Sequence, residues 1–183
     1  MNAASDDGPY GKIGEGGFGT VFKGLAVPPV GAAIGTSAVR LAVKRIDMHP
    51  AEENENVFLQ SFRREIRVLS KFQHTNIVRL MGYSERSAER NEPPCLVFEL
   101  LNLGSLSKQL SDNDKAALIP WQTRIDILLQ ISTAINYLHC HEDGHPAFHR
   151  DIKSANIALS DNYTAKLIDC GYYCETLFFS RML

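Results

Sequence analysis

The stretch FHRDIKSANIAL, at positions 148–159, decides how this chain is interpreted. In it Asp151, Lys153 and Asn156 stand at relative positions 1, 3 and 6, between a long helical pattern and a short apolar segment. A carboxylate accepts protons, an ammonium neutralises phosphate, and an amide oxygen helps to hold a divalent cation. We therefore expect a loop with acid-base and cation-binding chemistry, because a chance loop with this string is improbable.

A further acidic residue follows this loop. Asp169 lies 18 residues after Asp151, directly after the strand pattern AKLI at 165–168. A carboxylate at the end of a strand can serve as the second ligand of a cation that Asn156 also contacts. The spacing therefore predicts a metal site formed by Asn156 and Asp169.

A glycine cluster, GEGGFGTV at 14–21, lies between two alternating strand patterns. Taken alone, it is also the pattern of an ordinary hairpin turn. A Rossmann nucleotide site would need a helix after the glycines, whereas a strand follows here. Glycines allow backbone N–H groups to approach phosphate oxygens, so the context favours a two-stranded flap over phosphates.

Two charged residues stand in patterns that predict burial. Lys44 lies in the strand pattern 39–47, and Glu65 lies beside apolar residues in the helical pattern 52–72. A buried ammonium needs a carboxylate or an anionic ligand, so we expect Glu65 to pair with Lys44. Each charge taken singly would be an ordinary solvated surface group.

The order of periodic segments predicts a strand-rich half followed by a helix-rich half. We expect a flexible tail at 1–9, a first lobe at 10–101 and a second lobe at 102–183. The apolar residues of the long helical pattern 121–141 go nearly all the way round it, so we expect that helix to be buried on several sides. The other strand and helix patterns are 12–24, 76–84, 95–100 and a short helix from 104.

Composition narrows the class of partner. The 183 residues carry a net charge of -2, which gives no electrostatic reason to expect nucleic acid or an anionic membrane as partner. The N-terminus lacks the pattern of a signal peptide, and no apolar run reaches the ~18 residues of a membrane span. The four cysteines show no C-x-x-C spacing, which disfavours a disulfide framework or a zinc site. We expect a cytoplasmic protein.

Taken in order, these motifs resemble a eukaryotic protein kinase domain over residues 10–174. The strings IGEGGFGTVFKG, HTNIVRLMGY, RDIKSANI and YTAKLID are similar to the tyrosine-kinase-like group. The interleukin-receptor-associated kinases and Pelle are most similar, and plant receptor-like kinases come next. The resemblance implies an α+β bilobal fold, with a complete N-lobe of a five-stranded antiparallel sheet plus one helix and an incomplete helical C-lobe.

The resemblance also implies an activity. Lys153 in DIKSAN resembles the serine/threonine pattern, which implies phosphoryl transfer from Mg-ATP to a protein Ser or Thr hydroxyl. By the same resemblance, the partners would be a protein substrate and a receptor or adaptor complex, in receptor-proximal or innate-immune-type signalling. The cofactors would be ATP and Mg²⁺.

The resemblance assigns roles to individual residues. The residues that would contact ATP are Ile13, Gly14, Gly16, Gly19, Val21, Ala42, Lys44, Glu99, Leu101 and Ala158. The catalytic residues would be Asp151 as proton acceptor, Lys153 at the transferring phosphoryl group, and Lys44 oriented by Glu65. The Mg²⁺ ligands would be Asn156 and Asp169.

Three departures from the kinase pattern support an alternative. Cys170 replaces the aromatic residue of Asp-Phe-Gly, and Ala158 stands where a larger aliphatic residue is usual. Only 14 residues follow Asp169, which suggests a chain truncated before the activation segment. Without that packing neighbour, we expect the long helix 121–141 to keep an exposed apolar face. The alternative is a truncated or degenerate kinase that binds ATP or a partner without catalysis.

Overall fold

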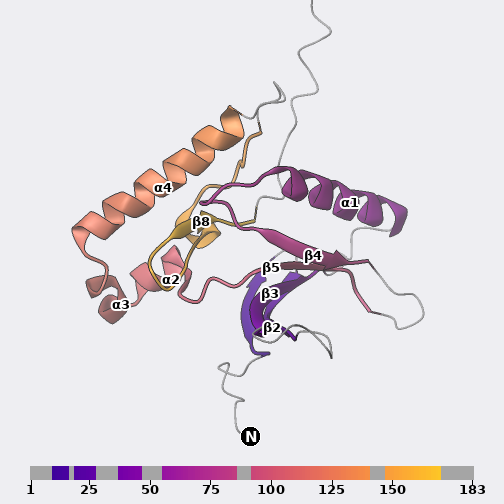
Figure 1. Cartoon of the computed structure of the whole chain (residues 1–183), viewed down its shortest axis with the longest axis horizontal. Coiled ribbons are helices and arrows are strands. Elements are labelled where there is room, and N and C mark those ends of the chain that lie inside the picture. Colours follow the sequence, from indigo (N-terminus) through magenta and orange to yellow (C-terminus); the bar gives the residue numbers. More distant parts are fainter. Residues whose placement is uncertain are drawn as a thin grey trace, which may run out of the picture. The chain divides into compact units, whose positions relative to one another are not determined.

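The computed structural model describes residues 10–16, 19–27, 37–46, 55–85, 92–140 and 147–169 (Figure 1). The chain divides into two compact units, Met1–Phe62 with Leu80–Leu100, and Arg63–Arg79 with Leu101–Leu183. The predicted tail at 1–9 lies outside the described residues. The predicted lobes, 10–101 and 102–183, stay a prediction.

The first unit is built on a five-stranded antiparallel sheet, as the sequence predicts. Its strands lie in the order β1-β2-β3-β5-β4, so β3 and β5 are interior strands. Leu96, in β5, is completely buried, as expected for an apolar residue of an interior strand. The strands are β1 (Lys12–Gly16), β2 (Gly19–Ala26), β3 (Val39–Arg45), β4 (Leu80–Ser84) and β5 (Cys95–Glu99).

One long helix, α1 (Glu55–Lys71), carries the chain from the first unit into the second. The prediction of a helix in this region is confirmed, and predicted positions 52–54 lie outside the described residues. Phe62 and Leu69 are buried, at the seven-residue separation that returns to the same helix face. Lys71 in the last turn complements the partial negative charge of the helix C-terminus.

The strand predicted over 76–84 is wrong at its start, because β4 begins only at Leu80. Ile77 instead forms an isolated parallel bridge with Leu167, far along the chain. The apolar run continues through both parts, so periodicity could not show that the backbone changes partner between them.

The second unit combines short strands and helices (Figure 1). A three-stranded sheet has the order β6-β7-β8. Helix α3 was not predicted from the sequence. Asp112 caps it, because its side chain accepts hydrogen bonds from the backbone N–H groups of Asp114 and Lys115. The elements are β6 (Gly104–Ser105), α2 (Leu106–Ser111), α3 (Asn113–Ala117), α4 (Trp121–His139), the 3-10 turn η1 (Ser154–Asn156), β7 (Ile157–Leu159) and β8 (Ala165–Leu167).

Helix α4 confirms the long helical pattern, but the expectation that several of its sides are buried is wrong. Its buried residues, Ile127, Ile131, Ala134 and Leu138, form a single stripe at intervals of four, three and four. Trp121, by contrast, is 75% exposed, and Leu128 and Leu129 are exposed as well. Among the described residues, no helix has the length and apolar character required to span a bilayer.

Candidate functional site

Two glycines of the β1–β2 pair, Gly14 and Gly19, have different roles. Gly19 has φ +125°, and a Cβ there would overlap the carbonyl oxygen of Arg45 and lie 3.0 Å from its carbon. The fold itself therefore requires glycine at position 19. A Cβ on Gly14 would only reach ordinary contact, at 4.0 Å from the Cβ of Val21. Among the described residues, no contact requires glycine at position 14. The missing side chain would instead leave room for a ligand beside the backbone.

The strand register places three predicted ATP-contacting residues on one face of the sheet. Val21 lies directly opposite Lys44, and Ala42 lies two residues before Lys44 on the same strand. Opposed residues in an antiparallel pair, and residues two apart in one strand, project to the same side. The face thus carries two small apolar side chains beside one ammonium group.

Lys44 is only 9% exposed, as the strand pattern predicts. It belongs to the first compact unit, whereas Glu65 belongs to the second. Their predicted pairing stays a prediction. Two further predicted ATP contacts are half-buried, Glu99 at the end of β5 and Leu101 just after it.

In the second unit, the loop before β7 brings together three residues that the sequence singled out. The carboxylate Oδ2 of Asp151 accepts hydrogen bonds from Lys153 Nζ at 2.8 Å and from Asn156 Nδ2 at 2.9 Å. Asn156 Nδ2 also donates to the backbone oxygen of Asp151 at 2.9 Å. The 3-10 turn η1 makes this closure possible, because it brings Asn156 back over Asp151.

These bonds keep Asp151 ionised. The hydrogen bond from Lys153 is the main cause that holds the pKa of Asp151 below its ordinary value of 3.8, and Asn156 adds to it. Partial desolvation acts in the opposite direction but is outweighed. At neutral pH the carboxylate is therefore an oriented, charged hydrogen-bond acceptor.

His149 connects this loop to the backbone before Asp169, a role that sequence reasoning missed. It is 2% exposed, its Nε2 contacts the backbone oxygen of Ile168 at 2.9 Å, and its Nδ1 accepts from the N–H of Asp151 at 3.3 Å. Both contacts are satisfied when Nε2 carries the proton. The available signal was its position two residues before Asp151.

Asp169 lies in the same unit, and the backbone connects it to the loop. The N–H of Ile168 donates to the backbone oxygen of Asn156 at 2.9 Å, so the residue before Asp169 is tied to Asn156. Asp169 is exposed and has φ +57°, as does Arg150 with φ +62°. Left-handed conformations at non-glycine residues cost energy and tend to gather at functional sites.

The oxygen of the Asn156 side chain fits a cation ligand. Asn156 is 5% exposed, and both of its side-chain hydrogen bonds use the nitrogen Nδ2. No donor among the described residues reaches Oδ1. A buried amide oxygen without a donor is costly unless it binds a cation or water. Oxygen ligands of this kind, together with a carboxylate, suit Mg²⁺.

The last predicted contact, Ala158, is buried in β7 opposite Lys166 of β8 and Ser105 of β6. Cys170, at the altered Asp-Phe-Gly position, lies outside the described residues.

These features define a kinase-type fold. The first unit has a five-stranded sheet with a glycine-bearing strand pair and a buried lysine, and the second unit has the Asp151 loop. Residues 10–176 match the family profile described as "Protein tyrosine and serine/threonine kinase". The chain therefore belongs to the protein kinase family, with a kinase N-lobe and a partial C-lobe.

Individual relatives agree with this assignment. The chain is 34% identical over 170 residues to the "Cysteine-rich receptor-like protein kinase 44" of Arabidopsis thaliana, covering 92% of this chain and 40% of the relative. It is 38% identical over 160 residues to the "Probable serine/threonine-protein kinase PBL25" of Arabidopsis thaliana, covering 87% of this chain and 37% of the relative. The chain thus spans less than half the length of these curated relatives.

Proposed function

We propose that the chain acts as an ATP-dependent protein serine/threonine kinase, transferring a phosphoryl group from Mg-ATP to a Ser or Thr hydroxyl of a protein. The observation that carries the proposal is the carboxylate of Asp151, held in one orientation by Lys153 and Asn156. Relatives whose names include serine/threonine-protein kinase support the choice of acceptor.

In this reaction Asp151 receives the hydrogen bond, and then the proton, of the substrate hydroxyl. Because its pKa is lowered, it is a weak base whose main effect is to orient the hydroxyl for attack. Lys153 stands 2.8 Å from that carboxylate, where its ammonium can also stabilise negative charge on the transferring phosphoryl group. The residues of the loop thus act by position and charge.

The cation would be held by Asn156 Oδ1 and the carboxylate of Asp169. When bound, Mg²⁺ neutralises charge on the phosphate oxygens. On the sheet, Lys44 would bind phosphate and be oriented by Glu65. The residues proposed to line the rest of the ATP site are Ile13, Gly14, Gly16, Gly19, Val21, Ala42, Glu99, Leu101 and Ala158.

The cellular setting is a further part of the proposal. Membership of the tyrosine-kinase-like group, with similarity to the interleukin-receptor-associated kinases and Pelle, would place the chain in cytoplasmic signalling close to a receptor or adaptor. The receptor-like kinases among the relatives support a receptor-proximal role.

The test combines nucleotide binding with turnover. The full chain is titrated with a non-hydrolysable ATP analogue with and without Mg²⁺, followed by thermal unfolding, and then assayed for phosphate transfer to serine/threonine protein substrates. We expect a thermal shift that Mg²⁺ enlarges. Asp151→Asn should lower turnover about 10²–10⁴-fold.

The matched control is Asp161→Asn, at the exposed turn after β7, where Asp161 accepts a hydrogen bond from Asn102. This variant should retain turnover. Nucleotide binding without transfer by the wild type would favour the non-catalytic alternative, and transfer that survives Asp151→Asn would refute the assigned mechanism.

A further inference from the structure

Asn76 is a buried asparagine to which the proposed reaction assigns no role. It is 7% exposed. Its Nδ2 donates to the backbone oxygen of Ala165 at 2.8 Å and to Oε1 of Gln130 at 3.1 Å. Its Oδ1 lies 3.3 Å from the hydroxyl of Thr133, whose single proton is shared with the closer backbone oxygen of Gln130 at 2.7 Å. One side chain thus joins α4 to strand β8.

Gln130, on α4, completes this connection. Its Oε1 also accepts from the N–H of Ala165 at 2.8 Å. The two side-chain amides therefore satisfy both backbone groups of Ala165, one each. In effect they replace a neighbouring strand at the start of β8.

Two residues further along β8, the backbone of the 76–78 segment takes over the same task. The N–H of Leu167 donates to the backbone oxygen of Asn76 at 2.8 Å, and the N–H of Val78 donates to the oxygen of Leu167 at 3.0 Å. The side chain and backbone of Asn76 therefore hold β8 at both of its ends.

Strand β8 leads directly to Asp169. On the opposite side, Ile168 is fixed at its N–H by Asn156 and at its oxygen by His149. The backbone before Asp169 is thus held between the loop that carries Asn156 and the pair formed by Asn76 and Gln130. A shift of β8 would change the separation of the two proposed cation ligands.

We propose that Asn76 and Gln130 are positioning residues for the cation site, acting through β8 to set the place of Asp169 relative to Asn156. This inference rests on the proposed function, because it concerns the same Mg²⁺ site. Residues that orient metal ligands from outside typically change metal affinity about 10–100-fold when they are replaced.

The test uses a pair of substitutions at Gln130 in the full chain. Gln130→Met keeps the length of the side chain but removes the oxygen that accepts from Asn76 and Ala165. Gln130→Glu keeps an oxygen that can accept both bonds. The apparent affinity for Mg²⁺ is measured by titrating Mg²⁺ into the complex with a non-hydrolysable ATP analogue, following the thermal shift.

We expect Gln130→Met to weaken Mg²⁺ about 10–100-fold, while the shift given by the nucleotide alone stays unchanged. Gln130→Glu should restore most of the affinity. Asn76→Asp, which turns a donor into an acceptor facing the oxygens of Ala165 and Gln130, should weaken Mg²⁺ as well. Thr133→Val is the control, because it removes one bond to Asn76 and leaves both groups of Ala165 paired.

The outcomes separate this inference from the proposed function. Asp169→Asn serves as the reference. If it abolishes the Mg²⁺ effect while Gln130→Met merely lowers the melting temperature and leaves Mg²⁺ affinity intact, the positioning role is wrong and the metal site stands. If the wild type shows no Mg²⁺ effect, the metal site fails and the positioning role fails with it. Should Asn76→Asp not fold, the Gln130 pair decides.

Discussion

Replacing Gly19 by alanine tests the distinction between Gly19 and Gly14 in the β1–β2 pair. At φ +125° an alanine backbone is strained, which costs about 1–3 kcal/mol. The new Cβ would also overlap the carbonyl oxygen of Arg45 and lie 3.2 Å from Cα of Ile46, and relieving such overpacking costs about 1–3 kcal/mol. The two effects together predict a loss of about 2–6 kcal/mol.

Gly14→Ala is the matched control, because its Cβ would lie 4.0 Å from the nearest atom outside its chain neighbours. We expect it to change the free energy of unfolding by less than about 1 kcal/mol. If position 14 faces phosphate, Gly14→Ala should nevertheless weaken binding of an ATP analogue, since the added methyl group would occupy the space of the ligand. Stability and ligand binding would thus respond to different glycines.

The assay must report on the first unit. The single tryptophan, Trp121, lies on α4 in the second unit, so its fluorescence is unsuitable. Hydrogen exchange measured by mass spectrometry on peptides of β2 and β3 gives the local opening free energy directly. A loss below about 1 kcal/mol for Gly19→Ala, or an equal loss for both variants, would refute the reasoning.

Three further predictions concern the second unit. Burial, and then the Lys166 ammonium, hold the pKa of His74 below its ordinary value of 6.5, so the unfolded state binds a proton more readily. Stability should therefore fall as pH drops below 6.5, and thermal melts of His74→Gln should show a smaller fall. Ser105→Ala removes the hydrogen bond that caps α2 and should cost about 1 kcal/mol in urea unfolding, whereas Ser111→Ala, at the far end of the helix, should cost less. Because the pKa of Asp151 lies below 3.8, kcat/KM should show no acidic limb from this residue above that pH, and such a limb would contradict the lowered pKa.

Local patterns predicted the elements whose own residues alternate or repeat at helical spacing. The strands of the sheet and α1 follow directly from alternation and helical spacing. The start of β4 could not be predicted, because it depends on a distant partner. Ile77 pairs with Leu167, which lies 90 residues further along the chain, and no periodicity encodes such a choice.

The candidate site shows the same limit. Asp151, Lys153 and Asn156 meet because they lie within six residues, so their spacing was sufficient to predict their proximity. The roles of Asn76 and Gln130 depend on contacts with Ala165 and were missed. The only sequence signal was the side-chain amide of Asn76, directly before the apolar run that begins at Ile77.

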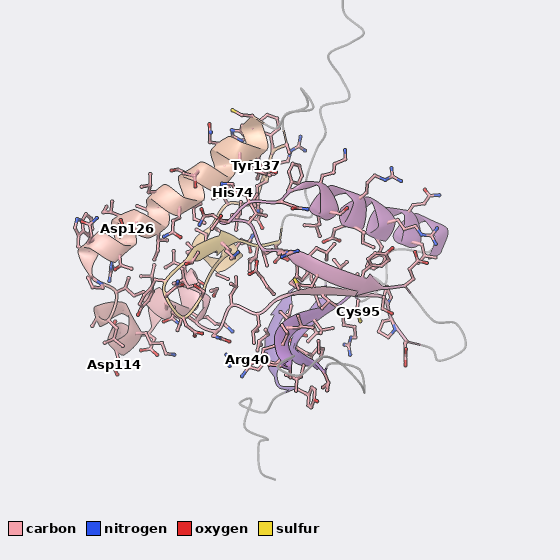
Figure 2. All side chains as sticks on the ribbon, viewed as in Figure 1. Arg40, His74, Cys95, Asp114, Asp126 and Tyr137 are labelled. Atoms are coloured by element: carbon pink, nitrogen blue, oxygen red, sulfur yellow. The ribbon has the colours of Figure 1, made fainter. Side chains whose placement is uncertain are left out.

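His74 and Tyr137 illustrate how these distant segments join. Their rings lie 5.0 Å apart, and the two side chains are labelled side by side in Figure 2. The hydroxyl of Tyr137 also accepts from the N–H of Gln73 at 3.2 Å. The turn after α1 is therefore tied to the C-terminal half of α4.

This arrangement decides where the polypeptide can be cut. A fragment beginning at residue 101 would exclude the whole five-stranded sheet. It would, however, leave the edge of β8 without the backbone groups of Asn76 and Val78 that bond to Leu167. Exposed strand edges of this kind promote self-association. A fragment that begins at Arg63 would keep them. A peptide spanning 63–79, added to the fragment that begins at residue 101, should therefore restore its folding.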